Sequence, residues 1–115
     1  MKTVIVFNKT TNELILDKVH LANSFLRRFK GLIGKRGLVP GEALLIRPCS
    51  SVHSFHMKFL FDVAFIDENN KVIYIIHSMK PWKCSPVIKK SKYVIETAGD
   101  YLNIKLKVDD EVEIL

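Results

Sequence analysis

The sequence predicts a mainly β domain, a compact β-sandwich or jelly-roll-like barrel with one short helix. Short segments rich in β-branched residues recur along the chain between polar turns, as they do in all-β domains. Apolar and polar residues alternate between Phe55 and Phe65, which indicates extended chain. The 115 residues fit a single domain, residues 1–115, and a hydrophobic content of 48% is enough for a globular core.

The expected strands begin near the N-terminus. Thr3–Phe7 and Glu13–Leu16 flank a polar turn, and this pattern predicts a hairpin. In the segment from Phe55 to Phe65 the odd positions are apolar, so one face of that segment is predicted to lie in the core. Its eleven residues are long for one strand, and a bend or bulge is expected to divide it. Further strands are expected at Val72–Ile76, at Tyr93–Thr97 and in a last segment ending at Leu115.

One segment has the periodicity of a helix. Its apolar residues recur at spacings of three and four, at Phe25, Phe29, Leu32 and Ile33. We therefore expect a helix at about residues 24–33. A single helical turn is also expected over 98–106, and Pro81–Lys92, with two prolines, is expected to form a long surface loop.

Charge and cysteine content limit the partners and the compartment. The formal charge of +6 favours anionic partners, but fourteen of the eighteen cations are lysine, which reads phosphate less specifically than arginine. The N-terminal apolar run of four residues is too short for a signal peptide, and no run reaches membrane-spanning length. Cys49 and Cys84 have no paired-metal spacing. We expect a cytoplasmic protein with reduced thiols and no membrane partner.

Several short fragments follow one another in a specific order from about Ala22 to the end of the chain. They are Arg28 with Gly31-Leu32-Ile33, Gly41 to Ile46, Cys49, His53, Met57, Asp62 to Asp67, Val72, Pro81, Val94 to Glu96, Ala98-Gly99 and Asp110. The ordered set resembles the uncharacterised family called domain of unknown function 192. The family usually has Met where Ile33 stands and Gly where Asp109 stands. The resemblance implies a compact β-sandwich or jelly-roll-like domain with a short helix, and it implies no established activity.

Cys49, His53 and His56 are candidate metal ligands. Zinc accepts one thiolate and two imidazoles, with a carboxylate or water in the fourth position. In extended chain, however, His53 and His56 point to opposite faces because three is an odd interval. The alternative is a buried thiol and two histidines held by hydrogen bonds.

The even positions of the alternating segment carry His56, Lys58 and Asp62. In an unbroken strand His56 and Lys58 lie roughly 7 Å apart, and Lys58 and Asp62 roughly 13 Å apart, distances that suit a pocket floor better than a catalytic pair. Two other interpretations stay open. The face is an ordinary solvent-facing one, or Asp62 is a structural acid that accepts backbone hydrogen bonds, because burying it unpaired is costly.

Arg28 lies at the margin of the apolar stripe of the expected helix and is placed to reach inward to Asp62 or Glu96. A bidentate pair of Arg28 with either carboxylate is structural. An Arg28 guanidinium left without a carboxylate instead binds an anionic ligand.

The segment Lys80–Lys92 combines five lysines with Trp82, a combination that also stacks bases of single-stranded nucleic acid. No base-reading module accompanies it, so we expect nucleic acid to bind weakly and without sequence preference. Neither a nucleophile elbow nor a phosphate loop is present, and no catalytic residue is predicted.

The sequence therefore favours a small-molecule or anion-binding β domain whose ligand is not identified. Its polar pocket is expected to contain Arg28, His53, His56, Lys58, Asp62 and Glu96. The alternatives are a metal-dependent enzyme using Cys49, His53 and His56, and a weak nucleic-acid-associated module. No cofactor is predicted.

Overall fold

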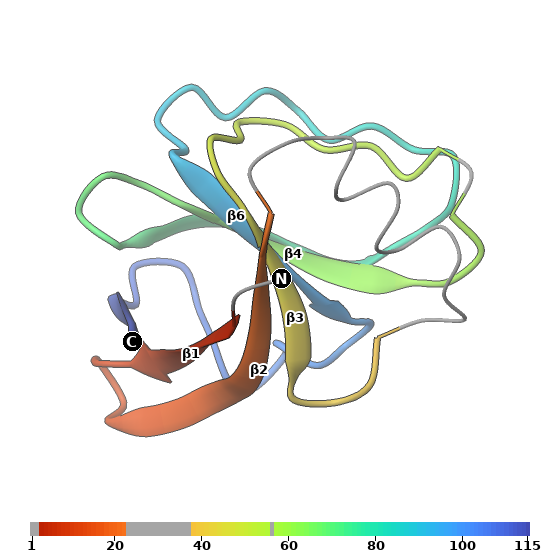
Figure 1. Ribbon diagram of the computed structural model, residues 1–115. Helices are drawn as coiled ribbons and strands as arrows, with labels where there is room; N and C mark the ends of the chain where they lie inside the picture. The colour runs from red at the N-terminus through yellow and green to blue at the C-terminus, as the bar shows by residue number, and fades with distance from the viewer. Residues whose placement is uncertain (1–2, 23–37, 56) are drawn as a thin grey trace.

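The computed structural model describes residues 3–22, 38–55 and 57–115, and these residues form seven strands in one curled sheet (Figure 1). Along the sheet the strands run β5-β4-β6-β3-β2-β1-β7, and every neighbouring pair is antiparallel except β2 and β3. The strands are β1 (Thr3–Asn8), β2 (Glu13–Ala22), β3 (Glu42–Ile46), β4 (Phe61–Ile66), β5 (Val72–Met79), β6 (Tyr93–Ala98) and β7 (Val112–Ile114).

The mainly β fold predicted from the sequence is confirmed, and the sheet takes the shape of a half-barrel. The helix expected at residues 24–33 lies outside the described residues. Residues 99–105, where a helical turn was expected, form consecutive turns instead. Among the described residues no helix is long and apolar enough to cross a membrane.

The predicted N-terminal hairpin is confirmed. β1 and β2 are antiparallel, and Asn8 pairs with Glu13 at the turn. The Oδ1 atom of Asn8 accepts hydrogen bonds from the amides of Thr10 and Thr11, at 3.0 and 3.3 Å, so the turn supplies its own side-chain acceptor. β2 continues six residues beyond the expected Leu16 to Ala22, because its second half pairs in parallel with β3. Because the pairing of β2 with β3 is non-local, no local sequence pattern predicts it.

Backbone hydrogen bonds join the two edges of the sheet at one end. The amide of Val72 at the start of β5 donates to the carbonyl of Asp110, at 2.9 Å, and the amide of Asp109 donates back to Val72, at 2.8 Å. The amide of Val112 in β7 donates to Asn70, at 2.8 Å. These bonds satisfy edge groups that are otherwise exposed, and they hold the half-barrel curled.

Both faces of β4 are buried, which corrects the expectation that only one face lies in the core. Phe61, Val63 and Phe65 pack in one apolar cluster, and Ala64 and Ile66 pack in a second cluster inside the half-barrel. The face that carries Phe61, Val63 and Phe65 is the outer one. It is buried because loop residues pack against it, namely Val52, Met57 and Ile88.

The alternating segment is divided, as the sequence predicts, because β4 begins only at Phe61. Before that point the amide of Met57 donates to the carbonyl of Ser54, at 3.1 Å, and turns the chain out of extended conformation. Phe55 is consequently 37% exposed, so its assignment to the core was wrong. Met57 is buried, as its odd position predicts.

Candidate functional site

Two loops that are distant in sequence lie against each other outside the regular strands. Residues 47–60, of which His56 is not described, and residues 80–92 form what we call the basic loop pair. Figure 1 shows the two loops running alongside each other above the sheet, in yellow-green and cyan. Backbone hydrogen bonds join the two loops in a pattern that resembles a strand pairing. They run from Cys49 N to Lys92 O at 3.2 Å, and at 2.8 Å from Ile88 N to Ser50 O, from Ser85 N to Val52 O and from Ser54 N to Lys83 O. The loop expected over Pro81–Lys92 is thus confirmed, with an ordered path.

The basic loop pair is strongly charged. It contains seven Lys or Arg residues and no Asp or Glu, so its formal charge exceeds the +6 of the whole chain. All seven are exposed, namely Arg47, Lys58, Lys80, Lys83, Lys89, Lys90 and Lys92. A local excess of one sign attracts and concentrates ligands of the other sign.

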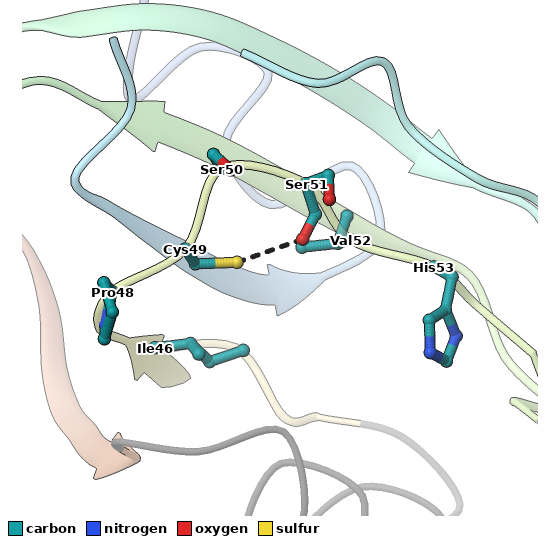
Figure 2. Close-up of a pocket in the computed structure, with 7 residues that line it drawn as sticks. All are labelled: Ile46, Pro48, Cys49, Ser50, Ser51, Val52 and His53. Carbon is teal, nitrogen blue, oxygen red and sulfur yellow. Dashed lines mark hydrogen bonds between the residues drawn. The ribbon is translucent and has the colours of Figure 1, made fainter. Parts of the chain in front are cut away.

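A pocket of about 250 Å³ opens in the first of these loops (Figure 2). It is lined by Ile46, Pro48, Cys49, Ser50, Ser51, Val52 and His53. The Cys49 thiol donates to the carbonyl of Ser51, with Sγ and O 3.1 Å apart. The Phe55 amide donates to Nδ1 of His53, at 3.2 Å, so in the neutral imidazole Nε2 carries the proton. The pocket is thus lined by two serines, a cysteine and a histidine together with the apolar residues Ile46, Pro48 and Val52.

A buried serine fixes the path of the second loop. Ser54 is 0% exposed, and its Oγ donates to the carbonyl of Lys80 while accepting from the amide of Lys83, at 2.8 Å. The Ser54 carbonyl accepts from the amide of Trp82, at 2.9 Å. Trp82 has a φ of 61°, a left-handed conformation that is unusual for a bulky residue. The turn around Trp82 is therefore held by Ser54.

Arg47, at the start of the basic loop pair, contacts Tyr93, the first residue of β6. The Arg47 guanidinium lies over the Tyr93 ring, with Cζ 5.2 Å from the ring centroid. Burial raises the pKa of Tyr93 to about 12, although the positive charge of Arg47 acts to lower it. Tyr93 therefore stays protonated near neutral pH, and its hydroxyl donates to Oδ1 of Asn70, at 2.8 Å.

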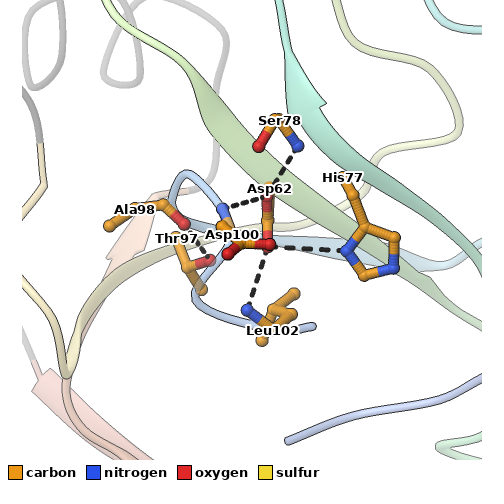
Figure 3. Close-up of polar contacts among 7 residues, drawn as sticks. All are labelled: Asp62, His77, Ser78, Thr97, Ala98, Asp100 and Leu102. Atoms are coloured by element: carbon orange, nitrogen blue, oxygen red, sulfur yellow. Dashed lines mark hydrogen bonds and ion pairs between the residues drawn. The ribbon is translucent and has the colours of Figure 1, made fainter. Parts of the chain in front are cut away.

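Asp62 has a structural role at the start of β4, where it joins the end of β5 to the turns after β6 (Figure 3). It is 0% exposed, its Oδ1 accepts from the amides of Ser78 and Asp100, both at 2.7 Å, and its Oδ2 accepts from the amide of Leu102, at 2.9 Å. The His77 Nδ1 atom lies 3.7 Å from Oδ2. Of the interpretations left open by the sequence, the structural acid is confirmed and the solvent-facing residue is wrong.

Asp62 and Glu96 do not face the same pocket. Glu96 is 0% exposed on β6 and pairs with Val63, so it projects from the same face of the sheet as Val63. Asp62 precedes Val63 on β4 and projects from the opposite face, because side chains alternate along a strand. The expectation that both acids contribute to one ligand pocket is therefore corrected.

The other expected site residues are distributed as follows. His53 lines the pocket, and Lys58 is an exposed member of the basic loop pair. Arg28 and His56 lie outside the described residues. Within the part of the chain that the structure describes, no three His, Cys, Asp or Glu side chains gather as a metal site. Since His56 belongs to the expected zinc set, that set remains a prediction.

Sequence reasoning missed two contacts that depend on the pairing of separate segments of the chain. His77 contacts Asp62 from β5, fifteen positions along the chain. Cys84 is exposed and pairs with His53 in an isolated antiparallel bridge, which places both side chains on one face. Neither contact has a local sequence signal, because each partner comes from a different loop or strand.

A second pocket, of about 380 Å³, provides a contrast to the first. It is lined by Leu14, Ile15, Leu16, Asp17, Pro40, Gly41, Tyr101 and Lys105. Burial, followed by the negative charge of Asp17, raises the pKa of Tyr101 above its ordinary value. The Lys105 Nζ lies 5.0 Å from the centroid of the Tyr101 ring. Because this pocket contains a carboxylate and one cation, it is less suited to an anion than the first.

The fold and the basic loop pair define a curled, mainly β domain with a small polar pocket in its loops. The model of the family DUF192, described as an uncharacterized ACR, matches residues 5–114. The chain belongs to this family, as its resemblance in sequence predicts.

Its relatives include archaeal proteins of uncharacterised function. A UPF0127 protein of Pyrococcus horikoshii is 32% identical, with 95% of this chain and 97% of that protein covered. A UPF0127 protein of Thermococcus sibiricus is 31% identical, with 95% of this chain and 76% of that protein covered.

Two crystal structures share the fold. A protein of unknown function from Novosphingobium aromaticivorans has a TM-score of 0.80 at 19% identity, covering 96% of this chain and 83% of that one. A protein described as a putative transcription regulator from Sinorhizobium meliloti has a TM-score of 0.77 at 18% identity, covering 96% and 91%. At these identities the likeness shows the fold alone.

Proposed function

We propose that this protein binds a small anionic ligand at the pocket of the basic loop pair. One observation carries the proposal. Two loops that are hydrogen-bonded to each other hold seven cations and no carboxylate, and the pocket opens in one of them. An anion held there is stabilised by the local positive field, and these loops contribute no negative charge that would repel it.

The pocket's chemistry and size support a small ligand. Hydroxyl and imidazole groups donate hydrogen bonds to an oxyanion, and such bonds are stronger when the acceptor is ionised. Its volume of about 250 Å³ lies just below the range of pockets that enclose drug-sized molecules. The ligand's anionic group therefore fits the pocket, while a larger ligand extends onto the neighbouring loop surface.

Titration calorimetry with inorganic pyrophosphate at low and physiological salt tests this proposal. We expect binding that weakens as salt rises, since exposed charges are screened. His53→Ala is expected to weaken binding about tenfold, by loss of a hydrogen bond to a charged group. Replacing Lys83 and Lys92 together by alanine is expected to weaken it about fivefold. Lys107→Ala, an exposed lysine outside the basic loop pair, is the matched control and is expected to change nothing.

The opposite pattern would overturn the proposal: no pyrophosphate binding at low salt, or equal losses from Lys107→Ala and the loop variants. Native mass spectrometry of the protein as purified gives a second readout. A retained anionic small molecule supports the proposal, whereas one retained zinc ion per chain supports the metal-dependent alternative with Cys49, His53 and His56 instead.

We also propose a cytoplasmic location. Cys49 and Cys84, the two cysteines of the sequence, are thiols and are not joined in a disulfide, which suits a reducing compartment. Cell fractionation tests this, and recovery of the protein with the extracellular or envelope fraction would contradict it.

A further inference from the structure

Three aromatic rings from the two loops stack on one another beside the pocket. The His53 and Phe55 ring centroids are 4.6 Å apart with an interplanar angle of 25°, and those of Phe55 and Trp82 are 5.9 Å apart at 27°. We call these three residues the aromatic ledge. Both spacings lie in the range of favourable aromatic pairs. Because His53 also lines the pocket, the ledge and the pocket are contiguous.

The ledge is presented at the surface. Trp82 is 59% exposed and Phe55 is 37% exposed. Burial of aromatic surface is favourable, so exposed rings that are stacked and ordered are typical of surfaces that bind a partner. The left-handed backbone of Trp82, held by hydrogen bonds to buried Ser54, adds a local conformational cost that is typical of functional positions.

We propose that the aromatic ledge binds a nucleobase, so that the anionic ligand of this protein is a nucleoside phosphate. This inference rests on the proposed anion site. The pocket and the basic loop pair receive the phosphate, and the ledge stacks on the base. Every base has an aromatic face, so such stacking requires no particular base.

Other ligand classes use only part of this surface. A small aliphatic anion makes no use of the rings, and a neutral sugar makes no use of seven cations without a carboxylate. A nucleobase linked to a phosphate uses both the aromatic rings and the cations. The same chemistry occurs in a free nucleotide and in single-stranded nucleic acid, and the experiment below separates these two sources.

Trp82 is the sole tryptophan in the sequence, so its fluorescence reports on the ledge. We expect adenosine monophosphate to quench this fluorescence and, by calorimetry, to bind about tenfold tighter than ribose phosphate, which lacks the base. Trp82→Leu and, separately, Phe55→Ala are expected to lower the affinity for adenosine monophosphate about tenfold and to leave that for ribose phosphate unchanged. Val87→Ala, an apolar residue of the same loop that is 66% exposed, is the matched control and is expected to change neither affinity.

The outcomes separate the two proposals. If ribose phosphate binds as tightly as adenosine monophosphate in the unmodified protein, the ledge proposal is overturned while the anion site stands. If adenosine quenches the Trp82 fluorescence, and neither adenosine monophosphate nor ribose phosphate binds more tightly than adenosine, the anion site is overturned instead. Binding of neither phosphate compound nor adenosine overturns both.

A short single-stranded oligoadenylate identifies the source of the base. Tighter binding of the oligonucleotide than of the mononucleotide, lost in Trp82→Leu and falling steeply with salt, supports the ledge and assigns a nucleic-acid strand as its partner. Oligonucleotide binding that survives both Trp82→Leu and Phe55→Ala contradicts the ledge proposal. Circular dichroism and melting temperature of each variant verify that the fold is retained.

Discussion

Replacing Asp62 by alanine is expected to lower the free energy of unfolding by about 3–5 kcal/mol. The carboxylate is fully buried and accepts the amides of Ser78, Asp100 and Leu102, which come from the end of β5 and from the turns after β6. Without it these amides lose their acceptor, and each buried, unsatisfied donor costs about 1–3 kcal/mol. Urea denaturation followed by circular dichroism measures the loss.

Asp67→Ala is the matched control for this change. The Asp67 Oδ1 also accepts two backbone amides, those of Asn69 and Lys71, at 2.9 and 3.0 Å. These bonds are at an exposed turn, where water replaces a lost acceptor, so we expect a loss of only about 1 kcal/mol. If Asp62→Ala cost no more than Asp67→Ala, Asp62 would not be the structural acid of this fold.

Phe65→Ala is expected to cost about 3–5 kcal/mol of unfolding free energy, as large aromatic truncations in packed interiors do. Phe65 is 0% exposed in the apolar cluster under the loops, and its ring contacts Tyr74 edge-on with centroids 5.7 Å apart. Phe55→Ala is the comparison, because both residues occupy odd positions of the same alternating segment. Since Phe55 is 37% exposed, its truncation is expected to cost about 1 kcal/mol or less. Equal costs, measured by guanidinium denaturation, would contradict this assignment of burial.

The sequence predicts most of this fold because its strong signals are local. The hairpin of β1 and β2 follows from two largely apolar segments around a polar turn whose Asn8 supplies the acceptor. Alternation places Phe61, Val63 and Phe65 on one face correctly. It cannot show that the other face is also buried, because the residues that enclose both faces come from distant parts of the chain.

The site was less predictable for the same reason. The absence of Asp and Glu from residues 47–60 and from 80–92 can be read in the sequence. The pairing of these two segments depends on hydrogen bonds between distant residues, such as those of Ser54 across 26 to 29 positions. Phe55 contacts Trp82 as a result of this pairing. The expected grouping of Asp62 with Glu96 failed because β4 places Asp62 on the face opposite to Val63 and its partner Glu96.

Backbone amide chemical shifts test most directly whether the basic loop pair is the anion site. They are recorded by NMR while inorganic pyrophosphate is added to the isotopically labelled protein. We expect the largest shifts at residues 46–55 and 80–92, with saturation at a single site. Shifts concentrated instead around the second pocket, at Asp17, Tyr101 and Lys105, or spread evenly over surface lysines without saturation, would contradict the proposed function.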